Sequence, residues 1–118
     1  MNKTNYQKVL DQIESNLACW NQSQWHCGTS HCFFGWAQIL SGEPANDARV
    51  IRDARIYLNV SRATASYLSN ADRTLLELKK FLIDDSDGYN RAGYNRADYN
   101  RAGYDSDGLD KNNKPAKK

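Results

Sequence analysis

Residues 6–20 read YQKVLDQIESNLACW, and their apolar side chains recur at intervals of three and four. This is the spacing of one face of an α-helix. We therefore predict a helix over residues 5–18, with Thr4 or Asn5 as its N-cap. The apolar positions that define this face are Tyr6, Val9, Leu10, Ile13, Leu17 and Trp20.

The same periodicity continues downstream and predicts four more helices. A second helix is expected over residues 30–40, capped by Thr29 or Ser30, and a third from Pro44 to Leu58, stopped by Asn59. A fourth is expected from a cap at Ser61 to residue 68, and a fifth over residues 72–82. Residues 1–83 contain no credible alternating strand pattern. The fold class indicated is all-α, a compact bundle of about five short helices.

Composition limits the function classes that this chain can serve. A length of 118 residues has room for one small domain and a tail, which excludes a multidomain enzyme. The sequence shows neither a run of 18 apolar residues nor a signal-peptide pattern, so we expect a cytoplasmic protein without a membrane partner. The net charge of +2 gives no independent support for a nucleic-acid surface.

Residues 84–118 have a different character from the rest of the chain. Tyr-Asn-Arg-Ala units begin at Tyr89, Tyr94 and Tyr99, and a divergent fourth unit begins at Tyr104. Asp-Ser-Asp-Gly occurs on both sides of them, at residues 85–88 and 105–108. The units resemble pentapeptide repeats, which coil into a four-sided β-helix, but four units complete at most one turn. We predict a disordered, low-complexity tail that self-associates through its Tyr and Arg residues or serves as a solvated spacer.

The most unusual stretch is WHCGTSHCFFGWA, residues 25–37. It resembles a group of small bacterial and phage proteins that share the pattern W-x-C-G-T-x-x-C-x-x-G-W-A. A segment like Ala54–Ser61 follows in that group. The group has no established activity, so the resemblance implies a domain and supplies no function.

Cysteine and histidine side chains in and near this stretch allow two chemical interpretations. Thiolate and imidazole groups are ligands that zinc prefers, and the candidate ligands are Cys19, Cys27, His31 and Cys32. Alternatively, a helix that begins at Ser30 would place Cys32 in its first turn, where the helix dipole favours a thiolate, with His26 or His31 as a base.

A structural interpretation explains the same residues without chemistry. Cysteine is often buried, Gly28 permits a tight turn, and Gly35 permits a close approach between helices. The three tryptophans would then form a core around the turn, and His26 and His31 would be exposed loop residues.

Residues 53–70 also resemble the helix-turn-helix of bacterial repressors. The resemblance implies that four side chains of the second helix would face DNA: Arg62, Thr64, Ser66 and Tyr67. Arg55 stands where such motifs have a small residue, and Asn59 replaces the usual turn glycine.

Taken together, these patterns favour a small helical, non-enzymatic binding or accessory domain with a protein partner and no cofactor. A DNA-binding regulator that uses residues 53–70 is the first alternative. A zinc-binding or thiol-active protein is the second.

Overall fold

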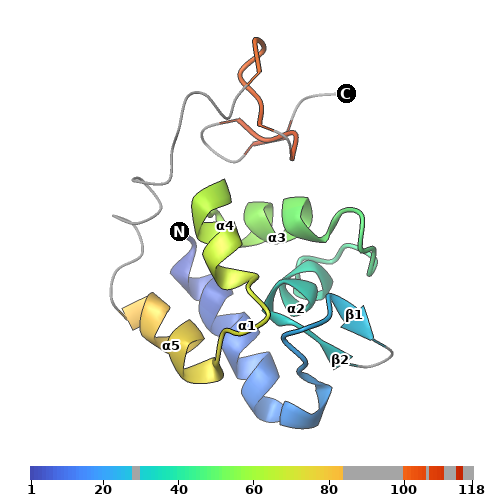
Figure 1. The fold of residues 1–118 in the computed structure, drawn as a ribbon, viewed down its shortest axis with the longest axis vertical. Helices are drawn as coiled ribbons and strands as arrows, with labels where there is room; N and C mark the ends of the chain where they lie inside the picture. Colours follow the sequence, from blue (N-terminus) through green and yellow to red (C-terminus); the bar gives the residue numbers. More distant parts are fainter. Residues whose placement is uncertain (28–29, 84–99, 106, 111–113, 116–118) are drawn as a thin grey trace.

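The computed structural model describes residues 1–27, 30–83, 100–105, 107–110 and 114–115. Within these ranges the chain forms five α-helices, as the sequence predicts (Figure 1). They are α1 (Lys3–Ser15), α2 (Phe33–Leu40), α3 (Val50–Leu58), α4 (Arg62–Leu68) and α5 (Leu75–Ile83). None of the helices in the described ranges has the length and apolar content needed to cross a bilayer.

Two short strands precede α2, where the sequence indicated no strand. Strands β1 (His26–Cys27) and β2 (Ser30–His31) pair antiparallel, with His26 opposite His31. The hairpin takes up residues that periodicity assigned to the second helix, which therefore begins at Phe33 and not at Ser30. A pattern of period two cannot be recognised in strands of two residues, which is why the sequence did not reveal them.

The helix ends differ from prediction at some sites and agree at others. Helix α1 begins earlier than expected, because the side chain of Asn2 accepts a hydrogen bond from the Asn5 backbone N–H at 3.0 Å. It ends at Ser15 and is followed by the 3₁₀ turn η1 (Leu17–Cys19). Helix α3 begins at Val50 and does not include Pro44.

The predicted ends around the α3–α4 joint are confirmed. Asn59 closes α3 in the left-handed conformation, with φ 54° and ψ 59°. Ser61 caps α4 by accepting a hydrogen bond from the Thr64 backbone N–H at 3.2 Å. Helix α5 starts later than predicted because Thr74 and Glu77 form a capping box, each side chain accepting from the other's backbone N–H.

The hydrophobic core lies between α1, α2 and α3, and α5 covers the outer side of α1. Tyr6 connects these layers: its ring centroid lies 4.8 Å from that of Phe33 in α2, and its hydroxyl donates to the Leu78 carbonyl of α5 at 2.7 Å. The tryptophans Trp20, Trp25 and Trp36 are partly buried against this core. The tryptophans therefore lie at the edge of the core and do not form it.

Part of the predicted tail also has a defined place. Residues 100–105 and 107–110 lie beyond α3 and α4 in Figure 1, and Asp105 and Leu109 are buried. Side chains of this segment contact the helical domain, and the expectation of a disordered tail over residues 84–118 stays a prediction. The Tyr-Asn-Arg-Ala units of residues 89–98 lie outside the described residues.

Candidate functional site

Cys32 is the N-cap of α2, one position before the helix in which the thiol hypothesis placed it. Its Sγ accepts a hydrogen bond from the Gly35 backbone N–H at 3.3 Å, and the side chain is buried. Burial raises the pKa of the Cys32 thiol to about 11, although backbone hydrogen bonds act in the opposite direction. At neutral pH the sulfur is therefore a thiol, whereas a nucleophile requires a thiolate.

The two motif histidines are not the exposed loop residues that the structural interpretation expected. His31 is buried, His26 is half-buried, and their Nδ1 atoms lie 2.6 Å apart. His26 Nε2 lies 2.7 Å from Gln38 Oε1, and Gln38 Nε2 donates to Asp53 Oδ2 at 2.8 Å. The hairpin is thus joined to α2 and α3 by a chain of hydrogen bonds, which we call the histidine relay.

The hydrogen bonds of the relay limit which ring nitrogens of His26 and His31 can carry protons. Gln38 Oε1 can only accept, so His26 Nε2 carries a proton and donates to it. Between the two Nδ1 atoms one ring donates and the other accepts, so the contact cannot hold with both Nδ1 atoms protonated. Burial, and secondly the nearby charge of His26, lower the pKa of His31. The relay therefore favours a neutral His31.

The residues expected to bind zinc occupy separate positions. Cys32 caps α2, His31 belongs to the relay, and Cys19 ends η1, where its carbonyl accepts from Trp36 Nε1 at 3.0 Å. The side chain of Cys27 lies outside the described part of the structure. Among the described residues, no three His, Cys, Asp or Glu side chains are grouped so that they could hold a metal. The zinc hypothesis stays a prediction.

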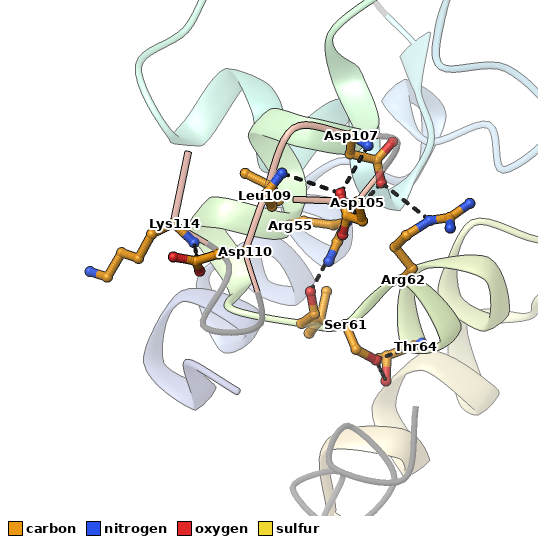
Figure 2. A network of polar contacts seen from close by, with 10 residues as sticks. Arg55, Ser61, Arg62, Thr64, Asp105, Asp107, Leu109, Asp110 and Lys114 are labelled. Atoms are coloured by element: carbon orange, nitrogen blue, oxygen red, sulfur yellow. Dashed lines mark hydrogen bonds and ion pairs between the residues drawn. The ribbon is translucent and has the colours of Figure 1, made fainter. Parts of the chain in front are cut away.

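A second polar cluster surrounds Arg55 in α3, and its contacts reach far along the chain. The Arg55 side chain is fully buried, and its Nε donates to the Val60 carbonyl at 3.1 Å. Its Nη1 lies 2.6 Å from Asp105 Oδ2 and 2.7 Å from Asp107 Oδ2 (Figure 2). The Nε atom of Arg62, the first residue of α4, lies 3.9 Å from the same Asp107 oxygen. We call Arg55, Val60 and Arg62 the Arg55 cradle.

The segment held by the cradle is a tight turn that presents two carboxylates together. Asp105 Oδ1 accepts from the backbone N–H groups of Asp107 and Leu109, at 2.9 and 3.2 Å. Gly108 has a φ of 79°, a conformation that favours glycine, and Leu109 is fully buried. Because one oxygen of Asp105 braces the turn, the other remains for Arg55. We call Asp105, Asp107, Gly108 and Leu109 the acidic turn.

The four side chains that the sequence proposes as DNA contacts differ in their exposure to solvent. Thr64 is buried against the cap at Ser61, so it does not face solvent. Tyr67 is half-buried, stacks on Phe81 and lies under the Arg73 guanidinium, whose Cζ is 3.8 Å from the ring centroid. Ser66 is exposed, and Arg62 is partly exposed beside Asp107. Because the Thr64 side chain is buried against the N-cap of α4, it is not available to a DNA groove.

Both halves of the cradle contact are visible in the sequence, but no sequence pattern joins them. Arg55 stands where a helix-turn-helix has a small residue, and Asp-Ser-Asp-Gly at residues 105–108 lies beside the repeats. No periodicity relates positions that are fifty residues apart, so only the folded chain brings them together.

No family model matches this chain, and no significantly similar curated protein or solved structure was found. The resemblances noted for residues 25–37 and 53–70 therefore stay predictions, and the functional argument rests on the geometry.

Proposed function

We propose that this chain is a non-enzymatic binding protein whose helical domain recognises an acidic turn through the Arg55 cradle. The partner is a protein segment with two aspartates separated by one residue, followed by glycine and an apolar residue. One observation carries the proposal: a fully buried guanidinium makes contacts of 2.6 and 2.7 Å to two carboxylates that arrive from a distant segment.

Physical chemistry explains why such a cradle is selective. A buried guanidinium is costly unless anionic groups satisfy it, so the site favours ligands that supply carboxylates in the correct geometry. Charge-assisted hydrogen bonds of this length are the strong class of hydrogen bond. Leu109 beside the two carboxylates is also buried, so we expect an apolar residue after the glycine to strengthen binding. In this chain the cradle is occupied by a segment of the same molecule.

The test uses full-length protein in which Asp105→Asn and Asp107→Asn weaken the internal ligand while leaving the cradle residues in place. A synthetic peptide of residues 100–110 is titrated in, and binding is measured by calorimetry. We expect saturable 1:1 binding to this variant. We expect binding to the unmodified chain to be weaker by at least about tenfold, because the tethered segment competes.

Two controls identify the contact. A peptide in which both aspartates are asparagine should not bind, and the protein variant with a further Arg55→Lys change should lose the two-carboxylate contact. Circular dichroism shows whether each variant remains helical. The absence of peptide binding to a folded Asp105→Asn, Asp107→Asn variant would reject the proposal.

Duplex DNA is a second candidate ligand, favoured by one observation. Helices α3 and α4 are joined by residues 59–61, with Asn59 in the left-handed conformation, a joint of the length found in helix-turn-helix units. Because Asp107 lies beside Arg62, DNA would have to displace the acidic turn. A duplex that competes with the peptide for the same variant would support DNA binding.

A further inference from the structure

The acidic turn contains an Asp-Gly pair, Asp107 and Gly108, which the structure describes. In such a pair the backbone nitrogen of the glycine can attack the aspartate side chain, because glycine has no Cβ to hinder the approach. We propose that Asp107 is a modification site: it is converted to isoaspartate when the acidic turn leaves the Arg55 cradle, and the change prevents the turn from returning. The inference does not require the cradle to bind another molecule.

The reaction consumes no reactant other than water. The Gly108 nitrogen forms a bond to Asp107 Cγ, and its proton leaves together with one carboxyl oxygen as water. The cyclic imide then takes up water at the main-chain carbonyl of Asp107, which breaks the bond from that carbon to the Gly108 nitrogen. The main chain now runs through the former side chain, and the former main-chain carbonyl is the free carboxylate.

In the folded protein both reacting groups are held by other contacts. Asp107 Oδ2 lies 2.7 Å from Arg55 Nη1 (Figure 2), and the Gly108 N–H donates to the Asp105 carbonyl oxygen at 2.9 Å. The Asp107 N–H donates to Asp105 Oδ1, also at 2.9 Å. Closure of the imide turns the Asp107 side chain and the Gly108 nitrogen toward each other, so these contacts must break. The rate therefore follows the population of the form in which the turn is released.

Exposure distinguishes Asp107 from the other aspartate of the turn. The Asp107 side chain is 22% exposed, whereas that of Asp105 has no exposed surface. Water, which the second step consumes, can therefore reach Asp107 at the rim of the cradle. Release of the turn, and not access of water, is then the step that controls the modification.

The modified turn cannot remake the contacts of the original one. Isoaspartate adds one methylene to the main chain and shortens the arm that carries the carboxylate by the same group. In the original turn, Asp105 Oδ1 accepts from the N–H groups of both Asp107 and Leu109, and the added carbon lies between these two donors. The carboxylate that reached Arg55 is displaced as well. The cradle of a modified molecule therefore stays open.

The first experiment measures isoaspartate formation at neutral pH in the full-length protein and in a synthetic peptide of residues 100–115. Trypsin releases residues 102–111 as one fragment, which separates this site from the Asp-Gly pair at residues 87–88. Mass spectrometry of the fragment locates the isoaspartate. The folded protein should react more slowly than the peptide by at least about tenfold, and denaturant should remove the difference. Equal rates in the folded protein and the peptide would overturn the inference.

Substitutions outside the reacting pair test whether the cradle protects it. Arg55→Lys removes the two-carboxylate contact and should raise the rate at least about fivefold. Arg52→Lys is the matched control with an unchanged rate, since Arg52 lies on the same helix and contacts Asp53 at 3.5 Å. Asp105→Ala, compared with a peptide that carries the same change, releases the turn without altering Arg55.

Circular dichroism shows which of these variants remain helical, and a helical variant decides the result even if the other does not fold. If the helical variants of Arg55 and Asp105 react as slowly as the unmodified protein, the inference is wrong.

The second experiment tests whether the change is irreversible. Protein aged in denaturant and then refolded contains both forms, and chromatography separates their fragments, so hydrogen exchange at the Leu109 amide can be followed for each form in one sample. In the unmodified form this amide donates to Asp105 Oδ1 at 3.2 Å and should be protected. In the isoaspartyl form it should exchange faster by at least about tenfold. Equal protection would show that the modified turn still occupies the cradle, which contradicts the inference.

Discussion

Gly35 lies where the first turn of α2 passes the backbone of Trp25. A Cβ atom built on Gly35 would lie 2.0 Å from the Trp25 carbonyl oxygen, far inside van der Waals contact. The close approach that the sequence predicted is therefore present, but the neighbour is the segment that leads into the hairpin and not another helix. Because the contacted atom belongs to the backbone, it cannot move aside as a flexible side chain could.

We expect Gly35→Ala to lower the free energy of unfolding by about 3 kcal/mol, since the added methyl forces α2 away from Trp25. Urea denaturation followed by circular dichroism measures the loss. Gly42→Ala is the matched control: its Cβ meets nothing within 4 Å, and the only cost, about 1 kcal/mol, comes from its φ of 92°. Equal losses in the two variants would contradict the packing explanation.

The β1–β2 hairpin shows how an element of four paired residues is stabilised by side chains from outside it. Strands this short contribute few backbone hydrogen bonds, and the histidine relay joins them to Gln38 and Asp53. The rings of His31 and Trp36 also form a T-shaped pair, with centroids 4.6 Å apart. The hairpin therefore depends on a neutral His31.

Acid should destabilise the domain through this element. The pKa of His31 is lowered in the folded protein, so the fold favours neutral imidazole. Its contribution is complete above the unfolded-state pKa of about 6.5 and is lost as the pH falls below that value toward the folded-state pKa. Urea denaturation at pH 7.5, 6.5 and 5.5 should show the loss in the last interval. His31→Gln should reduce this pH dependence, and an unchanged profile would assign it to other groups.

At the scale of the whole molecule, one buried ion pair joins the C-terminal segment to the helical domain. Arg55 and Asp105 have no exposed side-chain surface, and they are fifty residues apart. Removing one partner leaves a charge without compensation in a site that water does not reach. The pair therefore connects the stability of the domain to the position of the acidic turn.

We expect Asp105→Asn to lower the free energy of unfolding by about 3 kcal/mol because Arg55 loses a buried counter-charge. Glu14→Gln is the control: Glu14 pairs with Lys79 at 2.9 Å, also over a long sequence separation, but both side chains are about two-fifths exposed. That change should cost less than about 1 kcal/mol, since exposed ion pairs are weak. Chemical denaturation compares the two, and similar costs would show that the cradle contact is not the stabilising one.

Much of the helical domain could be predicted from local patterns. The five helices follow from apolar spacing, and the cap at Ser61 and the left-handed end at Asn59 depend on neighbours within a few residues. The hairpin, the His26–Gln38 hydrogen bond and the pairing of Arg55 with Asp105 could not be predicted in this way. Periodicity records which face of an element is buried, and it does not record which distant group meets that face. A buried charge finds its partner only when the chain has folded, which is why the cradle emerges from the structure while the helices were already visible in the sequence.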